Sequence, residues 1–123
     1  DTTGIRIVDG SGFSRENRLT TRAIAAAIRA AANDFATSPE FLASLSVSGT
    51  DGTLSDRMGY GGLEGVIRAK TGLLDGVTAI SGIMEAASGK RVIFSIITNE
   101  STCEAWKVHD VAHAILMHVH QNL

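Results

Sequence analysis

The chain has 123 residues, 44% of them hydrophobic, so it is long enough for one packed domain and too short for two. Its formal net charge of -2 argues against nucleic acid or an anionic membrane as a partner, because either requires a basic surface. A single cysteine, Cys103, excludes an internal disulfide, and no apolar run approaches the roughly 20 residues of a membrane-spanning helix.

The first 18 residues predict a short strand followed by a reversal of the chain. Ile5–Val8 is β-branched, and the Asp-Gly-Ser-Gly sequence at residues 9–12 is typical of a tight turn. The loop that follows places the Ser14 hydroxyl and the Asn17 carboxamide three positions apart, where both side chains can reach one spot. These two residues indicate a site, but turns also use serine and asparagine to satisfy backbone groups.

Two helices are predicted next. Thr20 or Thr21 can cap an alanine-rich helix over residues 22–33, whose small side chains favour close packing and imply no chemistry. Ser38-Pro39 has the cap-and-proline arrangement of a helix start, so we expect a short helix over residues 39–45. Residues 49–62 are glycine-rich and predict a loop, with a helical turn over residues 53–58.

Three strands and a closing helix are expected in the second half of the chain. The strands cover residues 66–72, 77–84 and 91–98, joined by tight turns into an antiparallel meander. The third run is continuously apolar, which predicts a central strand covered on both faces. From about Thr102, an apolar pattern predicts an amphipathic helix over the sheet, with these residues at helical spacing: Trp106, Val111, Ile115, Val119. The predicted fold class is therefore α+β, an antiparallel sheet flanked by helices.

The first of these strands ends in Lys70-Thr71-Gly72, which places an ammonium and a hydroxyl beside a glycine. Gly72 has no side chain to block a second backbone, so an extended peptide could pair with this edge and present an anionic group to Lys70 and Thr71. An ordinary edge strand with a solvated lysine explains the same three residues.

His109 and His113 are four residues apart and share a face of the last helix, as two metal ligands would. Asp110 stands where the zinc-protease pattern has glutamate, and no third ligand is evident. We expect a structural pair or a solvated helix face, with no metal and no cofactor.

The loop over residues 9–18 (DGSGFSRENR) and the strand Ala69-Lys70-Thr71-Gly72 together resemble a family. They are similar to class C low-molecular-mass penicillin-binding proteins, the DacB-like D-alanyl-D-alanine carboxypeptidases/endopeptidases. Asp51-Gly52-Thr53-Leu54, Leu74-Asp75-Gly76-Val77 and the stretch from Gly89 to Phe94-Ser95-Ile96 also fit the family's spacing. The resemblance runs from about Asp9 to Asn99.

The resemblance implies a serine acyl transferase that binds peptidoglycan stem peptides ending in D-Ala-D-Ala and is acylated by β-lactams in the periplasm or elsewhere in the cell envelope. Ser14 would relay a proton to the leaving amine, and Asn17 would hold the substrate amide. Lys70 and Thr71, beside Gly72, would bind the terminal carboxylate, and the Leu73 backbone N–H would be an oxyanion donor.

Three features depart from the family pattern. No Ser-x-x-Lys pair, the family's nucleophile and base, occurs in the 123 residues. Ser14 and Asn17 are separated by two residues where the motif is usually described with one, and Leu73 replaces a common serine or threonine. We therefore expect a single partial domain over residues 1–123, the C-terminal half of a transpeptidase domain whose N-terminal half supplies the nucleophile.

Two other functions fit parts of this pattern. A serine β-lactamase shares the Lys-Thr-Gly strand, although the loop over residues 9–18 argues against it. A catalytically silent module that binds peptidoglycan or β-lactams would keep the cleft without the nucleophile.

Overall fold

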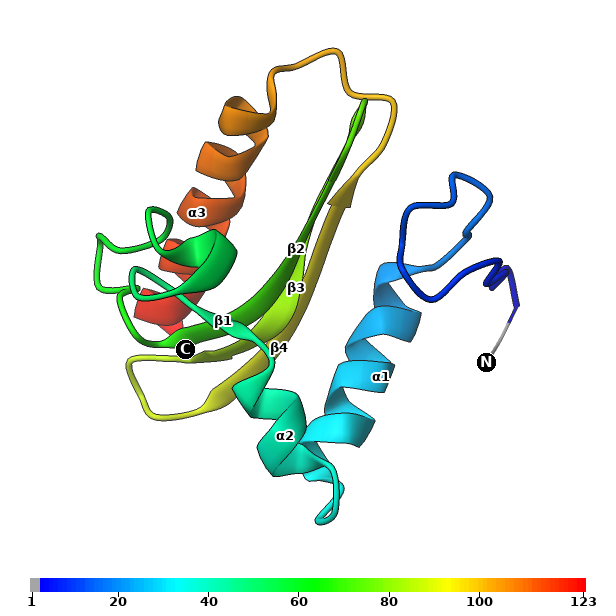
Figure 1. Ribbon diagram of the computed structural model, residues 1–123. Helices are drawn as coiled ribbons and strands as arrows, with labels where there is room; N and C mark the ends of the chain where they lie inside the picture. Colours follow the sequence, from blue (N-terminus) through cyan, green and yellow to red (C-terminus); the bar gives the residue numbers. More distant parts are fainter. Residues whose placement is uncertain (1–2) are drawn as a thin grey trace.

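Three long runs rich in β-branched residues form the sheet of the computed structural model, which describes residues 3–123. These runs are β2 (Ile67–Leu74), β3 (Val77–Glu85) and β4 (Arg91–Thr98). A two-residue strand, β1 (Ser46–Val47), pairs with β2, and all neighbours in the order β1-β2-β3-β4 are antiparallel (Figure 1). The predicted α+β fold with an antiparallel sheet flanked by helices is confirmed.

Helices lie on both faces of this sheet. Figure 1 shows α3 (Ala105–Asn122) on one face and α1 (Thr21–Asn33) on the other, where α1 packs on β4 and β3. The short α2 (Ser38–Ala43) follows α1 and packs against it. Thr20 caps α1, since its hydroxyl accepts a hydrogen bond from the Ala23 N–H at 3.1 Å, as the sequence predicts. No helix in the described residues combines the length and apolar character needed to cross a membrane.

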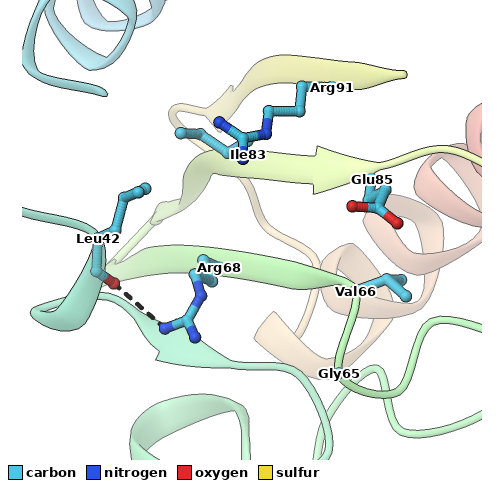
Figure 2. Close-up of a pocket in the computed structure, with 7 residues that line it drawn as sticks. All are labelled: Leu42, Gly65, Val66, Arg68, Ile83, Glu85 and Arg91. Atoms are coloured by element: carbon cyan, nitrogen blue, oxygen red, sulfur yellow. Dashed lines mark hydrogen bonds between the residues drawn. The ribbon is translucent and has the colours of Figure 1, made fainter. Parts of the chain in front are cut away.

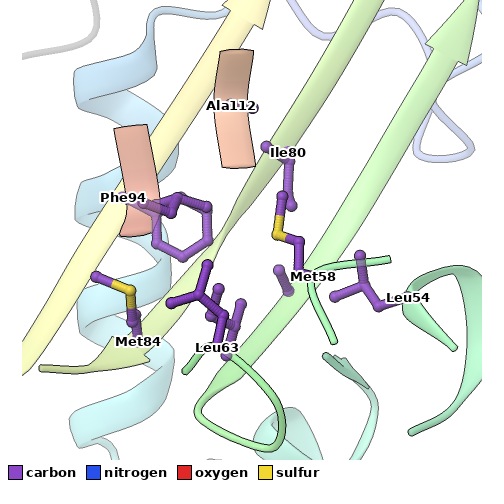
Figure 3. Packing of buried hydrophobic residues seen from close by; sticks show 10 residues of the cluster. Leu54, Met58, Leu63, Ile80, Met84, Phe94 and Ala112 are labelled. Atoms are coloured by element: carbon purple, nitrogen blue, oxygen red, sulfur yellow. The ribbon is translucent and has the colours of Figure 1, made fainter. Parts of the chain in front are cut away.

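The hydrophobic core lies between the sheet and α3. Its members come from β2, β3, β4, α3 and the segment that leads into β2, which carries the 3-10 helix η1 (Gly52–Leu54). Figure 3 shows this packing. The residues of the cluster are Leu54, Met58, Leu63, Ile67, Ala69, Ile80, Met84, Phe94, Ala112 and Leu116. Burial of Ile67 and Ala69 fixes one face of β2 toward the core, so Arg68 and Lys70 must lie on the opposite face.

The structure corrects three expectations about the elements. Ile5–Val8 is not a strand. Only an isolated bridge joins Arg6 to Arg18, and the Val8 N–H donates to the Asn17 side chain instead of to a neighbouring strand. β4 lies at the edge of the sheet in the described residues, although its continuous apolar run predicted a central strand. Such a run indicates that both faces of a strand are covered, and it does not show that a strand lies on each side.

The third correction concerns the face that α3 presents to the sheet. Ala112, His113 and Leu116 are buried, whereas Trp106, Val111 and Ile115 are exposed. Apolar side chains lie on much of the circumference of this helix, so their spacing alone does not predict which face is buried.

Candidate functional site

The edge of β2 beyond β1 forms the first part of the candidate site. β1 pairs with β2 only at Arg68 and Ala69, so in residues 3–123 no strand covers that side of the stretch from Lys70 to Leu74. The expectation of an edge strand therefore holds for the stretch from Lys70 to Leu74, whereas β1 covers Arg68 and Ala69. An extended ligand could therefore form main-chain hydrogen bonds along this stretch.

The register of β2 determines which backbone groups face that free edge. The Ser48 N–H donates to the Ile67 carbonyl at 3.0 Å, and the Ile67 N–H donates to the Ser48 hydroxyl at 3.1 Å. Both backbone groups of Ile67 thus point toward β1. Because both groups of a residue face one side of an antiparallel ladder and the sides alternate, the N–H and C=O of Thr71 and Leu73 point to the free edge.

Lys70 places its positive charge at the same edge. Its side chain leaves the face opposite the core, and Nζ bends back to donate to the Thr71 carbonyl at 2.7 Å. No carboxylate in residues 3–123 forms an ion pair with Lys70. The ammonium is therefore exposed and uncompensated beside the backbone groups that an extended ligand would use.

The other cation on this face of β2, Arg68, is engaged with the protein. Its guanidinium donates to the Leu42 carbonyl of α2 at 3.3 Å, as Figure 2 shows. Arg68 lines a cavity of about 210 Å³ with Glu85 and Arg91, at the end of the sheet near α2. Since the Arg68 guanidinium is bound to the Leu42 carbonyl of α2, Lys70 is the better placed cation for an anionic ligand at the edge.

Thr71 presents its hydroxyl to the segment before β2. Thr71 Oγ1 donates a hydrogen bond of 2.9 Å to Thr53 Oγ1, which belongs to η1. Thr53 is exposed, so the pair of hydroxyls lies at the surface beside the free edge.

The loop over residues 9–18 forms the second part of the candidate site and is closed by its own hydrogen bonds. The Arg6 and Arg18 backbones exchange two bonds of 2.9 and 2.8 Å at its base. Inside the loop, the Asp9 carboxylate accepts from the Ser11 hydroxyl, the Asn17 amide, and the Gly12 and Ser14 N–H groups. The hydrogen bonds from Ser11 and Asn17 hold the pKa of Asp9 below its usual range.

Ser14 and Asn17 have different freedom in this loop. The Asn17 oxygen accepts from the Val8 and Asp9 N–H groups at 2.8 and 3.3 Å, and its nitrogen donates to Asp9 at 2.7 Å. The Ser14 hydroxyl accepts from the Glu16 N–H at 3.2 Å and keeps its proton for another acceptor. Asn17 is thus largely committed to the shape of the loop, whereas Ser14 can still donate.

Arg15 attaches this loop to the sheet. Both terminal nitrogens of its guanidinium donate to the Asp75 carbonyl, at 3.1 and 3.2 Å, in the turn between β2 and β3. A cavity of about 640 Å³ lies between the loop and the ends of the strands, and its walls include Ser14, Asn17, Gly72 and Leu74. The structure therefore brings Ser14 and Asn17 together with Gly72, whereas Lys70, Thr71 and Leu73 belong to the adjoining edge.

Of the two alternatives that the sequence left for His109 and His113, a structural pair or a solvated helix face, the structure favours the structural pair. His113 is buried and stacks on Tyr60 with 3.9 Å between ring centroids, and His109 lies 3.3 Å from the Arg57 guanidinium. Both histidines line a cavity of about 160 Å³ behind Thr71. Burial is the main cause that lowers the pKa of each imidazole. Among residues 3–123, no group of three potential metal ligands forms here or elsewhere.

Sequence reasoning missed two contributors to this geometry, Thr53 and Arg15. Both lie in stretches that carry the family resemblance, but neither has a residue type that marks it as functional. Their contacts join residues 18 and 60 positions apart, so only the folded chain shows which backbone or side chain each one meets.

The free strand edge, the Lys-Thr-Gly sequence and the adjoining loop are the features on which the sequence resembles DacB-like carboxypeptidases. The model of the D-Ala-D-Ala carboxypeptidase 3 (S13) family matches residues 1–119, and the chain belongs to this family.

Individual relatives agree with this assignment. The chain is 35% identical over 121 residues to carboxypeptidase DacB of Mycolicibacterium smegmatis, a match that covers 94% of the chain and 26% of the relative. It is 38% identical over 106 residues to carboxypeptidase Rv3627c of Mycobacterium tuberculosis, covering 82% of the chain and 23% of the relative. The chain thus spans about a quarter of the length of these relatives.

A solved structure also shares the fold. Penicillin-binding protein 4 (dacB) of Haemophilus influenzae, in complex with a β-lactam, superposes with a TM-score of 0.83 at 24% identity, covering 92% of this chain and 28% of that one. A second structure of the same protein gives a TM-score of 0.75 at 27% identity and covers 94% of this chain and 26% of that one.

Proposed function

We propose that this chain supplies the substrate-binding edge of a serine-type D-Ala-D-Ala carboxypeptidase that acts on peptidoglycan stem peptides and is acylated by β-lactams. The observation that carries the proposal is the free edge of β2, where Lys70 and Thr71 present a cation and a hydroxyl beside unpaired backbone groups. Membership of the S13 family supports the reaction class. Such an enzyme works in the cell envelope, where peptidoglycan is found.

In this proposal, the terminal carboxylate of the peptide binds Lys70 Nζ and the Thr71 hydroxyl. The peptide backbone lies antiparallel to β2, and Gly72 leaves room for it. The Leu73 N–H points to the same edge and donates to the oxyanion that forms when the scissile carbonyl is attacked. A fixed cation and fixed donors at this edge stabilise the developing charge without having to reorganise during the reaction.

Ser14 and Asn17 act from the loop wall in this proposal. Ser14 keeps a hydroxyl proton and lines the cavity beside Gly72, which suits transfer of a proton to the leaving amine. Asn17 retains at most one free N–H after its three bonds within the loop, so its larger contribution is to hold the Ser14 loop in shape.

The nucleophile of this enzyme is proposed to lie outside residues 1–123, in an N-terminal half that forms one transpeptidase domain with this chain. The chain has no Ser-x-x-Lys pair, and none of its serines has a lysine three positions on. A serine needs such an adjacent base to attack a carbonyl at neutral pH.

The test is to label the complete protein with a fluorescent penicillin and to locate the adduct by peptide mass spectrometry. We expect one labelled serine outside these residues and no adduct on the isolated chain. A labelled serine within residues 1–123 would reject the assignment of the nucleophile. Absence of any adduct on the complete, folded protein would reject the proposed function.

A further inference from the structure

Thr53 lies outside β2 and forms a hydrogen bond with the hydroxyl of Thr71 in the Lys-Thr-Gly sequence. The hydrogen bond from Thr71 Oγ1 to Thr53 Oγ1 is 2.9 Å long and joins β2 to η1 at the surface. A hydroxyl can donate one hydrogen bond and accept two, so each member of this pair can still engage a further group.

The segment around Thr53 is held in place on three sides. The Asp51 carboxylate accepts from the Val47 N–H at 2.7 Å, which ties the start of η1 to β1. Leu54 is fully buried in the core. Between them, Gly52 has a φ of +55°, and a Cβ at this position would lie 2.3 Å from Ser46 Oγ.

These contacts leave Thr53 little freedom. Gly52 is needed both for its left-handed backbone and for its close approach to β1. With Asp51 bound to β1 and Leu54 in the core, the intervening residue is directed to the free edge of β2. The position of the Thr53 hydroxyl is therefore built into the fold.

We propose that Thr53 is a positioning residue for the carboxylate of the ligand, a role that rests on the proposed function of the β2 edge. It fixes the rotamer of Thr71 and can donate to Thr71 Oγ1 when Thr71 donates to the anion. When the site is empty, Thr71 donates to Thr53. When a carboxylate binds, the Thr71 proton turns to the carboxylate and the Thr53 proton turns to Thr71 Oγ1.

This exchange of donor and acceptor between Thr53 and Thr71 stabilises a bound anion more than a neutral ligand. A hydroxyl that accepts a hydrogen bond becomes a better donor, so Thr53 strengthens the bond from Thr71 to the carboxylate. A ligand whose carboxylate is esterified accepts more weakly and gains less from the pair, because hydrogen bonds to charged groups are roughly twice as strong as neutral ones.

The test uses the complete protein and two probes, benzylpenicillin and its methyl ester. Thr53→Val removes the hydroxyl at nearly constant volume. We expect it to slow acylation by benzylpenicillin about tenfold, the upper end of what one net hydrogen bond contributes, and to change acylation by the methyl ester less than about twofold. Thr53→Ser should restore most of the rate with benzylpenicillin.

Thr50→Val is the matched control. Thr50 belongs to the same connection, and its hydroxyl donates to the Ser48 carbonyl at 3.2 Å instead of to β2. We expect this variant to acylate like the wild type with both probes. A second comparison keeps the test decisive if Thr53→Val lowers the melting temperature. In a protein that already carries Thr71→Val, adding Thr53→Val should not change the ratio of the acylation rates with benzylpenicillin and its methyl ester.

Each result decides the proposal. A selective loss with the free acid and rescue by Thr53→Ser support it. Equal losses with both probes would show that Thr53 only supports the fold, and wild-type rates with both probes would show that it plays no part, so either outcome overturns the proposal. If the wild-type protein reacts with benzylpenicillin, these failures leave the proposed function intact. A wild-type protein that does not react rejects both.

Discussion

Lys70 is an exposed cation at the edge of β2 without an ion pair in residues 3–123, whereas Arg68 on the same face is bound to the Leu42 carbonyl. The side chain does not stand out into solvent but bends back to the Thr71 carbonyl, which points to the free edge. This contact places Nζ beside the backbone groups of the free edge, where the proposed function requires a cation.

We predict that Lys70→Gln slows acylation of the complete protein by benzylpenicillin about a hundredfold, since loss of one preorganised donor at developing charge costs about 3 kcal/mol. Lys70→Arg should recover part of this loss, because it keeps the charge but not the compact ammonium. Second-order acylation rates and melting temperatures measure both effects. Lys90→Gln, a change of an exposed lysine in the turn before β4, is the control, and equal rates for all variants would contradict the prediction.

His113 is a second residue with a testable environment. Burial lowers the pKa of its imidazole, and the weaker effect of Asp110 raises it. The ring stacks on Tyr60, and its buried Nε2 has no hydrogen-bond partner in the described residues. The other charged or titratable groups around the cavity that it lines are Asp56, Arg57 and His109. The folded protein thus favours the neutral ring.

We predict that acid destabilises the protein partly through His113. As pH falls below the ordinary histidine pKa of 6.5, the unfolded chain takes up a proton before the folded protein does, so stability decreases from there downward. His113→Phe keeps a ring against Tyr60 and cannot titrate, so its melting temperature should fall less between pH 8 and pH 5. His118→Phe, at an exposed position of α3, should behave like the wild type; equal slopes for all three proteins would disprove the prediction.

At the scale of elements, the pairing of β2 with β3 brings the two backbones unusually close at Gly82. A Cβ at Gly82 would lie 2.2 Å from the Arg68 carbonyl oxygen and 2.6 Å from the Ala69 Cβ. At Gly72, by contrast, the nearest atom to an added Cβ is the Ala79 Cβ at 3.5 Å, an ordinary contact. Gly82 is therefore needed for the close pairing of β2 and β3, whereas the sheet does not require a glycine at position 72, where a ligand can approach.

We predict that Gly82→Ala lowers the free energy of unfolding by about 1–3 kcal/mol, the usual cost of overpacking, because β2 must shift to admit the methyl group. Gly72→Ala should leave the melting temperature nearly unchanged but slow acylation, because its methyl group meets the approaching peptide. Thermal unfolding and acylation rates of the two variants separate these effects. If Gly72→Ala were as unstable as Gly82→Ala, its loss of activity would say nothing about the ligand.

The elements also show what the sequence could and could not predict. The strands over residues 67–98 and the helix capped by Thr20 follow from local patterns, because alternation, turn glycines and caps act over a few residues. The place of β4 at the sheet edge and the buried face of α3 depend on what packs beside them. Lys70 and Thr71 could be predicted as site residues from a motif. Thr53 could not, because its place in the site depends on the long-range contact between η1 and β2.

At the scale of the whole molecule, several large apolar side chains of the described residues are exposed. Phe35 is 99% exposed, and on α3 Val111 and Ile115 are 60% and 46% exposed one helical turn apart. Monomeric proteins rarely leave adjoining large apolar side chains on the solvent face of a helix without a partner. Because the chain spans about a quarter of the length of its relatives, we expect other parts of the complete protein to cover this face of α3.

We therefore predict different effects of one double substitution in two contexts. Val111→Asp with Ile115→Asp should lower the melting temperature of the complete protein by several degrees, since burial of two such side chains contributes about 2 kcal/mol or more. In the isolated chain the same change should leave the melting temperature nearly unaltered and reduce binding of the dye ANS, because those residues face solvent there. Gln121→Asp, an exposed polar position of α3, controls for added charge on the helix. A complete protein that tolerates the double substitution as well as Gln121→Asp would show that this face of α3 is uncovered.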